Sequence, residues 1–227
     1  MGDETNYFER GLYSLSDASK LTGIDTRSIS RWLRGYQYKR SGEAHSIPAV
    51  IISDYAPIGG KSALSFLDMM ELRLVRRFRK HGLSFQKIRV AATRAAKILE
   101  NSHPFASRRF VTDGKTILLQ IAREANDSDL LDLVKEQYAI EDILSPLLLE
   151  GVEFVGDLPE RWSPANGIII DPRYSFGQPV VASCTIPCAT LFSAYQAERS
   201  IQKVASWFEI DPDAVRQAVD FETRSAA

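Results

Sequence analysis

The sequence predicts a mainly α-helical protein with small β elements, an α+β fold. Two observations carry this prediction. Residues 13–36 read as two short helical patterns joined by a glycine, and residues 190–221 hold three more. Short runs rich in β-branched residues, near residues 50 and 168, lie between glycines and prolines and favour small strands. With 227 residues the chain can form one large domain or two modest ones.

The composition is that of an ordinary globular protein, with 44% hydrophobic and 25% charged residues. No apolar run approaches the roughly 20 residues that a membrane helix needs, so we expect no membrane partner. The first ten residues are acidic and polar and lack a signal-peptide core, which favours a cytoplasmic location. The two cysteines, Cys184 and Cys188, are expected to behave as small buried hydrophobic residues, with a redox sensor as the alternative.

The net charge of −1 conceals a division between the two halves of the chain. Residues 1–97 hold 17 Lys and Arg against 9 Asp and Glu, a net charge of +8, and residues 98–227 carry −9. A basic front half beside an acidic rear half suits a protein with one polyanionic partner and one different partner.

The first helical pair is bounded by residues that start and end helices. Ser16 is the candidate N-cap of the first helix and Asp25 of the second. Gly23 stands between them, where the chain must turn sharply. This order of cap, helix, glycine, cap and helix predicts a helix-turn-helix.

The second of these helices carries arginines on one face. At 100° per residue, Arg27, Arg31 and Arg34 project within about 60° of one another. The opposite face is apolar and consists of Ile29, Trp32, Leu33 and Tyr36. A helix that is apolar behind and cationic in front can pack on a core and reach phosphates, which predicts a DNA-reading helix. The alternative is an amphipathic helix whose arginines only face solvent.

The next segment predicts a short sheet or wing attached to the helix pair. Residues 50–52 are β-branched and read as a strand, which residues 59–61 end in a loop. Lys39, Arg40 and Lys61 lie in the flexible stretches beside this strand, where we expect them to contact DNA backbone.

Residues 66–99 predict two further helices. Ser65 caps the first with Asp68 as the partner of a capping box, His81 and Gly82 end it, and Ser84 caps the second. The expected buried line of the first helix is Phe66, Met70, Leu74 and Phe78, and that of the second is Phe85, Ile88, Ala91, Ala92, Ala95, Ile98 and Leu99. The first helix also carries a basic cluster that faces solvent or, alternatively, phosphates: Arg73, Arg76, Arg77, Arg79 and Lys80.

The middle of the chain predicts β structure and a linker. Asp113-Gly114 between alternating arms indicates a type I′ hairpin over residues 108–121. In the acidic stretch that follows, residues 138–154 predict a short helix and a strand. Residues 158–167 hold two prolines and a glycine and read as a linker. The domains expected from this division are residues 10–100, 101–160 and 165–223.

The rear of the chain predicts a small β-arch and a bundle of three helices. The arch covers residues 168–191 and is punctuated by prolines and glycine. Helices follow over residues 190–197, from the cap Ser200 to Phe208, and from Pro212 to Phe221. Trp162 and Trp207 are expected to pack in cores, the latter in this helix-turn-helix-like bundle.

Three segments resemble known families. Residues 13–36 and 64–89 resemble the two helix pairs of MerR-type winged helix-turn-helix domains. The tail, with its DP, GQPV and IP motifs and the run IDPDAVRQAVDFE, resembles the module called domain of unknown function 433. Their order, with the DGK segment between them, resembles that of VapB-type antitoxins, which pair with PIN-like toxins.

Two departures from these families affect what the resemblance implies. The tail module usually has an arginine where this chain has Thr185. The contacts that the arginine makes in relatives therefore do not carry over to this chain. MerR regulators also have a long terminal dimerisation helix. Here the helix ending near Leu99 is followed by His103 and Pro104, so that mode of dimerisation does not carry over either.

The resemblance implies an antitoxin that neutralises a PIN-like ribonuclease toxin and binds operator DNA as a homodimeric autoregulator. We expect Arg27 and Arg31 to reach base edges and Ser28 and Ser30 to contact phosphates or bases. Arg34, Lys39, Arg40 and Lys61 would hold the DNA backbone. The acidic rear half would bind a basic toxin. The alternatives are a stand-alone MerR-like regulator with an effector- or redox-responsive rear half, and an adaptor that does not bind DNA.

The sequence contains no convincing catalytic constellation, so we expect no enzymatic activity and no cofactor. His45, His81 and His103 lie in or beside loops and helix ends, and none is followed by a metal-ligand residue at position i+3 or i+4. His81 is expected to interact with a helix dipole. The acidic groups of residues 127–132 and 141–142 are expected to face solvent or a partner, with a divalent ion as the alternative. We therefore predict no metal.

Overall fold

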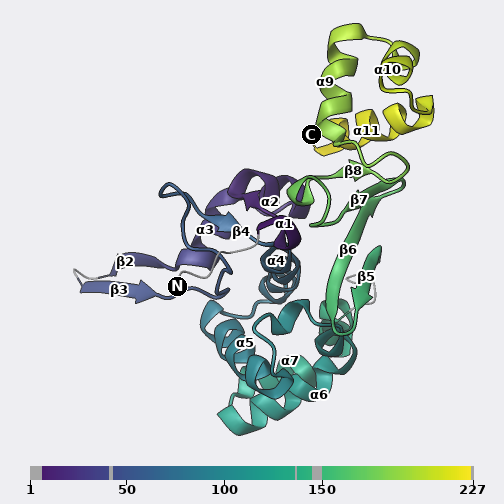
Figure 1. The fold of residues 1–227 in the computed structure, drawn as a ribbon. Coiled ribbons are helices and arrows are strands. Elements are labelled where there is room, and N and C mark those ends of the chain that lie inside the picture. The colour runs from purple at the N-terminus through teal and green to yellow at the C-terminus, as the bar shows by residue number, and fades with distance from the viewer. Residues whose placement is uncertain (1–6, 41–42, 136, 145–149, 226–227) are drawn as a thin grey trace, which may run out of the picture. The chain divides into compact units, whose positions relative to one another are not determined.

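The computed structural model describes residues 7–40, 43–135, 137–144 and 150–225 (Figure 1). The chain divides into two compact units. The N-terminal unit comprises residues 14–150 and 154–159, and the C-terminal unit comprises residues 1–13, 151–153 and 160–227. Helices dominate both units and the sheets are small, so the predicted mixed α+β class is confirmed.

The N-terminal unit begins with the predicted helix-turn-helix. Helix α2 covers Leu15–Thr22 and α3 covers Thr26–Arg34. The capping prediction for α2 was wrong by two residues, because Ser14 and not Ser16 accepts from the Asp17 backbone in a reciprocal capping box. The predicted turn is confirmed, since Gly23 has a φ of 66° and ends α2 in the left-handed conformation.

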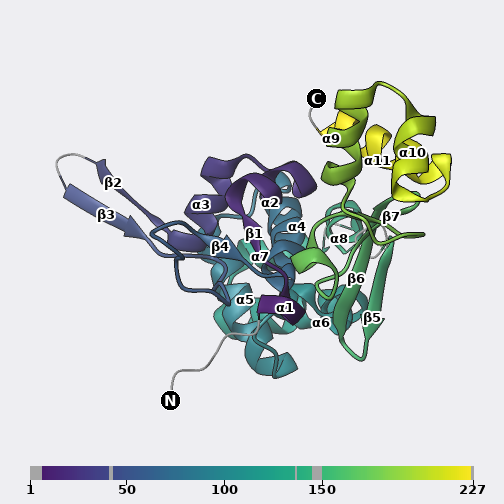
Figure 2. The same ribbon diagram turned by 45° about the horizontal axis from the view of Figure 1, so that its top comes forward.

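The wing is a hairpin that lies earlier in the chain than the predicted strand. Strand β2, Tyr36–Arg40, pairs antiparallel with β3, Glu43–Ile47, and the hairpin extends away from the helices in both views (Figures 1 and 2). The predicted strand at residues 50–52 is absent from this described segment. Val50 and Ile51 are instead buried, and both their backbone N–H groups donate to the carbonyl of Trp32. Their β-branched side chains therefore close the core behind α3.

Two long helices form the support of this unit. Helix α4 covers Phe66–Lys80 and α5 covers Phe85–Leu99. The predicted caps are confirmed, because Ser65 and Asp68 form a capping box, His81 ends α4, and Ser84 caps α5. The apolar line predicted for α4 is buried in full. Strand β4, Ala63–Leu64, precedes α4, and the 3-10 helix η1, Pro104–Ala106, follows α5.

The predicted central hairpin was wrong, because residues 108–125 form one helix, α6, Arg108–Ala125. Its buried residues recur with helical period: Phe110, Val111, Gly114, Ile117, Leu118, Ile121 and Ala122. Gly114 is a close-packing position, since a Cβ there would lie 2.8 Å from a methyl group of Leu144. Helices α7, Ser128–Lys135, and α8, Gln137–Ile143, complete the unit, and α8 confirms the predicted short helix.

The C-terminal unit contains most of a four-stranded sheet in the order β5-β6-β7-β8. The strands are β5, Val152–Val155, β6, Leu158–Ala165, β7, Ile168–Ile170, and β8, Val180–Val181. The linker predicted at residues 158–167 was therefore wrong in its first eight residues, which form β6 and bury Trp162. The pairing of β6 with β7 shifts register between Trp162 and Ala165, where Pro164 stands, and a proline is tolerated at such an irregularity. The remaining short elements are the helix α1, Tyr7–Arg10, the strand β1, Tyr13–Ser14, and the 3-10 helix η3, Ser175–Gly177.

The three predicted tail helices are confirmed and can be followed in Figure 2. They are α9, Cys188–Glu198, α10, Ile201–Phe208, and α11, Pro212–Ser225. Ser200 caps α10 as expected. Cys188 is fully buried among apolar residues, which bears out the prediction for this thiol.

The packing prediction for Trp207 was wrong, because its side chain is 63% exposed. In α10 the residues that face the core are Val204 and Ala205, with Phe208 partly buried beside them. Trp207 lies about 100° around the helix from the centre of that face and therefore points outward.

Candidate nucleic-acid interface

Helix α3 is fixed to the N-terminal unit by its apolar face. Ile29 is fully buried, and Trp32 is 6% exposed and packs on Phe85 of α5 with ring centroids 6.0 Å apart. Asp25 accepts a hydrogen bond of 2.8 Å from the Ser28 backbone at the first turn. Hydrogen bonds from Ser28 also lower the pKa of Asp25, so the cap stays ionised at neutral pH.

The arginines of α3 face outward, but the structure gives them different surroundings. Arg27, Arg31 and Arg34 are all exposed, whereas Ser28 and Ser30 are half-buried. The Arg31 guanidinium lies over the ring of Tyr36, 5.2 Å from its centroid. The predicted orientation, with the arginines outward and Ile29 and Trp32 inward, is therefore present. The prediction for Tyr36 was wrong, because this residue begins β2 and lies against Arg31 instead of on the opposite face of α3.

Arg34 also makes contacts with the loop before β4. Its Nε donates to Ser62 Oγ at 2.6 Å, and its Nη2 donates to the Gly60 carbonyl at 3.2 Å. Lys61 lies in the same loop, in a tight turn closed by hydrogen bonds between Ile58 and Lys61, and is exposed. Arg34 therefore places Lys61 at the end of α3.

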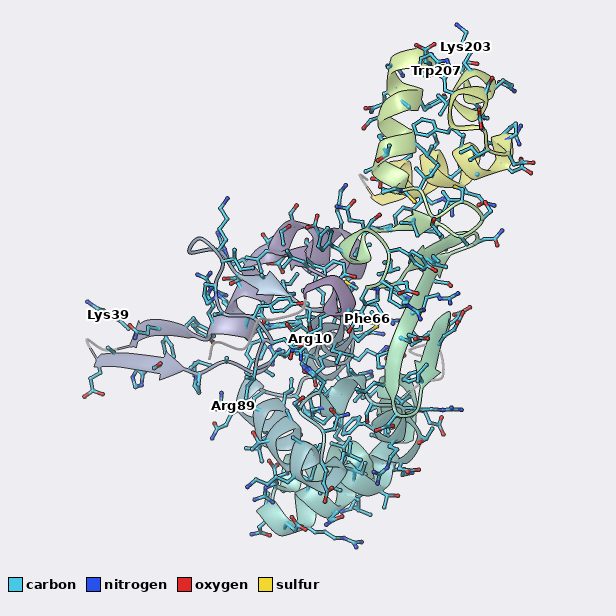
Figure 3. The ribbon with its side chains drawn as sticks, in the orientation of Figure 1. Arg10, Lys39, Phe66, Arg89, Lys203 and Trp207 are labelled. Carbon is cyan, nitrogen blue, oxygen red and sulfur yellow. The ribbon has the colours of Figure 1, made fainter. Side chains whose placement is uncertain are left out.

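The hairpin adds a stacked aromatic row beside α3. Tyr36 and Tyr38 lie with ring centroids 6.1 Å apart, and Tyr38 stacks on His45 across the strands at 5.1 Å. Lys39 is exposed on β2, as Figure 3 shows, and belongs to a strand rather than to the flexible stretch that was predicted. Arg40 also lies in β2, but its side chain is outside the described part of the structure.

The junction between α3 and the hairpin requires glycine. Gly35 has a φ of 70°, and a Cβ there would lie 2.2 Å from the Ile47 carbonyl oxygen. The backbone of β3 thus passes directly against the end of α3. Arg89 of α5, which the sequence did not single out, donates to the Pro48 carbonyl just after β3 (Figure 3).

The second basic cluster, on α4, remains partly solvated, since Arg76, Arg79 and Lys80 are exposed, but its side chains also make contacts within the unit. Arg73 donates to the Met70 sulfur at 3.5 Å. Arg76 donates to the Thr22 carbonyl at the end of α2, and Arg79 donates to the Leu83 carbonyl and lies over the Phe85 ring. Arg77 and Lys80 converge on Asp142 of α8, where His81 joins them. These contacts join helices, so the cluster is structural.

Asp142 is the centre of this contact between α4 and α8. Its Oδ2 lies 2.8 Å from His81 Nε2 and 3.4 Å from Lys80 Nζ. The hydrogen bond from His81 is the main cause that lowers the pKa of Asp142. His81 thus pairs with a carboxylate in addition to ending α4.

One cluster of titratable groups was missed by the sequence analysis. His103 is 3% exposed, and its ring nitrogens lie 2.9 Å from Asp54 Oδ1 and 3.4 Å from Glu71 Oε2. Asp68 is fully buried beside them. Asp54, Asp68 and His103 are far apart in sequence. The signal that could have indicated the cluster was the pair Asp68 and Glu71, two carboxylates three residues apart on the buried face of α4.

Burial and pairing shift the pKa values in this cluster. Burial raises the pKa of Asp68 to about 6. Burial alone would lower the pKa of His103, but hydrogen bonds with Asp54 and Glu71 outweigh it and raise the value to about 10. His103 is therefore an imidazolium at neutral pH.

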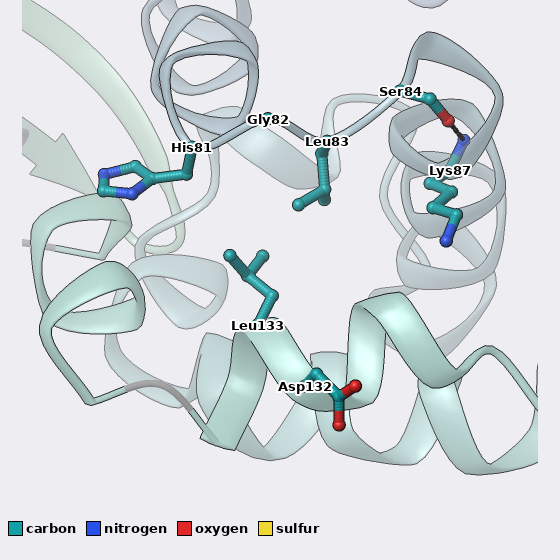
Figure 4. A pocket seen from close by; sticks show the side chains of 7 residues that line it. All are labelled: His81, Gly82, Leu83, Ser84, Lys87, Asp132 and Leu133. Carbon is teal, nitrogen blue, oxygen red and sulfur yellow. Dashed lines mark hydrogen bonds between the residues drawn. The ribbon is translucent and has the colours of Figure 1, made fainter.

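A small cavity of about 370 Å³ lies beside the turn between α4 and α5 (Figure 4). Its lining includes Leu83 and Leu133, which point toward one another, and Lys87. Lys87 Nζ lies 3.0 Å from Asp127 Oδ1. Asp127 also caps α7, because the same oxygen accepts from the Leu130 backbone. Asp127, one of the acidic residues predicted as alternative ion ligands, therefore pairs with Lys87 and caps a helix. The side chain of Asp129, another of them, lies outside the described residues.

Comparisons with known proteins agree with the order of segments seen in the sequence. Residues 11–92 match the family described as "Putative DNA-binding HTH domain", and residues 168–221 match "Protein of unknown function (DUF433)". The chain is 27% identical over 230 residues to the Mycobacterium tuberculosis protein named "Putative antitoxin VapB45", covering 94% of each chain. The predicted resemblance to DUF433 modules and VapB antitoxins is confirmed, and the MerR detail stays a prediction.

The same arrangement of elements occurs in a solved structure. The crystal structure of Rv2018 from Mycobacterium tuberculosis matches with a TM-score of 0.68 at 22% identity, covering 91% of this chain and 96% of that one. This match supports the fold. In the part of the chain that the structure describes, none of the helices has the length and apolar character to span a bilayer.

Proposed function

We propose that this protein is the antitoxin of a toxin–antitoxin pair and binds its own operator DNA with α3 and the β2–β3 hairpin. The observation that carries the DNA-binding part is the outward arginine edge of α3 above the buried Ile29 and Trp32. The match of residues 11–92 to an HTH family and the similarity to a protein named as an antitoxin support it.

The surroundings of each cation suggest a division of work on DNA. Arg27 and Arg31 stand on the exposed face of α3 and would reach base edges in the major groove. Ser28 and Ser30 would contact phosphates or bases. The backbone contacts would come from side chains around the helix: Arg34, Lys39, Arg40 and Lys61.

A compact reader of this kind acts as a homodimer on half-sites about 34–36 Å apart, or a multiple of that distance. Size-exclusion chromatography with light scattering, with and without a palindromic DNA, measures this. A strictly monomeric complex on DNA would contradict this part of the proposal.

For the toxin we propose a basic PIN-like ribonuclease bound by the C-terminal part of the chain. Residues 98–227 carry a net charge of −9, which favours a basic partner. Trp207 offers an exposed aromatic anchor on α10, and tryptophan is enriched among the residues that dominate binding energy at interfaces. Figure 3 shows Trp207 near the end of α10, with Lys203 one turn before it.

The alternative of a redox-responsive regulator loses support at Cys188. This thiol is buried, and burial raises its pKa to about 12, so it is not the thiolate that oxidants attack.

The experiment is co-expression of the full chain with the protein encoded by the adjacent gene, followed by a mobility shift on the upstream DNA. We expect copurification, inhibition of ribonuclease activity, and a shift that weakens with salt. Trp207→Ala should weaken copurification, whereas Gln202→Ala, an exposed control on the same helix, should not. A chain that binds neither the neighbour nor DNA would overturn the proposal.

A further inference from the structure

The buried cluster around His103 brings together three segments of the N-terminal unit. Asp54 comes from the loop between β3 and β4, Asp68 and Glu71 come from α4, and His103 precedes η1. Asp54, Asp68 and His103 each offer a ligand atom, and these atoms lie within 4.8 Å of one another. His103 and Asp68 are 3% and 0% exposed, so the group is enclosed.

One carboxylate oxygen in this cluster is unsatisfied. Asp68 Oδ2 accepts from Ser53 Oγ at 2.8 Å and from the Ser65 backbone at 2.9 Å. Asp68 Oδ1 is buried and has no hydrogen-bond partner among the residues that the structure describes, although it lies 3.9 Å from His103 Nδ1. A buried oxygen of this kind needs a partner, which an ordered water or a bound cation can supply.

The charges of the cluster also call for a cation. Three carboxylates surround a single imidazole, so even a protonated ring balances only one of them. Buried charges in proteins are paired or coordinate metals, because an unpaired buried charge is strongly destabilising.

The position of Glu71 matches the support that metal-bound histidines receive. Its Oε1 accepts from the Phe105 backbone at 3.0 Å, and its Oε2 lies 3.4 Å from His103 Nδ1. A carboxylate held by the backbone and bonded to one ring nitrogen fixes the ring and leaves the other nitrogen for a metal. Here that other nitrogen, Nε2, lies 2.9 Å from Asp54 Oδ1, and a bound metal would displace the proton that Nε2 carries in the imidazolium.

We propose that Asp54, Asp68 and His103 bind one Zn²⁺ ion, with Glu71 as the positioning residue of His103. Zn²⁺ binds imidazole nitrogen and carboxylate oxygen together, and the imidazole favours it over Mg²⁺ and Ca²⁺, which prefer oxygen ligands. The ion would connect three segments of the N-terminal unit: the loop before β4, which also carries Lys61, helix α4, and the residue before η1. It would therefore hold that loop against α4. This proposal does not depend on the antitoxin function.

The test uses the full chain without a histidine tag, stripped with chelator and titrated with Zn²⁺ by calorimetry. Metal content is measured after gel filtration. We expect one ion per chain and a melting temperature that falls when chelator is added. Asp68→Asn is the main variant, because the amide oxygen can still accept from the Ser65 backbone and keep the cap of α4. It should lower the Zn²⁺ affinity at least about tenfold and abolish the chelator effect.

Two controls and a fold check make the result decisive. His81→Gln and His45→Gln remove the other histidines and should keep one ion per chain. Circular dichroism should show that Asp68→Asn is folded, and if it is not, Asp54→Asn replaces it, since Asp54 is less buried. Absence of Zn²⁺ binding by the wild type, loss of the ion in His81→Gln, or equal binding of Ca²⁺ would overturn the proposal.

Discussion

Replacing Arg31 with alanine separates sequence reading from simple attraction to phosphates. Arg31 stands on the exposed edge of α3, and its guanidinium lies over the Tyr36 ring at 5.2 Å. A guanidinium at this position that forms two hydrogen bonds with a guanine contributes about 1–3 kcal/mol of discrimination. Arg31→Ala should therefore weaken operator binding by roughly 5- to 150-fold at 25 °C.

The folded state should change much less. The contact that the structure gives Arg31 with Tyr36 is a cation–π interaction at an exposed site, which contributes about 0.5–1 kcal/mol. The free energy of unfolding should thus fall by no more than about 1 kcal/mol. Chemical denaturation measures this value and shows that lost DNA binding is not lost folding.

The assay is fluorescence anisotropy on the operator and on an unrelated duplex of equal length, over a range of salt concentrations. Lys39→Ala is the comparison, because a phosphate contact on β2 should weaken both duplexes equally and reduce the salt slope. Arg123→Ala, an exposed arginine on α6, controls for net charge. If Arg31→Ala weakens both duplexes equally, α3 holds phosphates and reads no sequence, and the reasoning is refuted.

Three further variants test the supporting structure. Trp32→Ala removes a side chain packed on Phe85 and should cost about 3–5 kcal/mol, which urea unfolding measures; a loss below about 1 kcal/mol would contradict its core role. Gly35→Ala places a methyl group against the Ile47 carbonyl at a position with positive φ, so the melting temperature should fall. Gly59→Ala is the control, because the space around its Cβ is open, and it should lower the melting temperature less. The pKa of Asp142 is lowered in the folded state, so its contribution is present at neutral pH and is lost as the pH falls through that pKa. Unfolding of Asp142→Asn should therefore depend less on pH in the acid range than unfolding of the wild type, and identical pH profiles would show that the pair with His81 does not contribute.

The parts of the fold that the sequence predicts well are those that local chemistry decides. Asp25, Ser65 and Ser84 cap the helices that follow them, because a short polar side chain can satisfy the first backbone N–H groups without help from the rest of the fold. The outward edge of α3 also follows from helical periodicity alone.

The errors lie where distant contacts decide. Asp113-Gly114 is a strong turn signal, but the helical spacing of the apolar residues around it wins, and Gly114 serves as a packing position instead. The His103 cluster could not be seen in one dimension, because its members meet only after α4 and η1 have folded together. For Trp207, a rotation of about 100° around α10 separates the core from the surface, and the residue is exposed.

The contacts that run from Arg31 through Tyr36 and Tyr38 to His45 couple the end of α3 to the hairpin. A smaller side chain at position 36 would remove the contacts with both Arg31 and Tyr38, so such a substitution acts on α3 and on the hairpin at once. Under the proposal that Arg31 reads the operator, a change of sequence preference would therefore require the arginine and this ring to be replaced together.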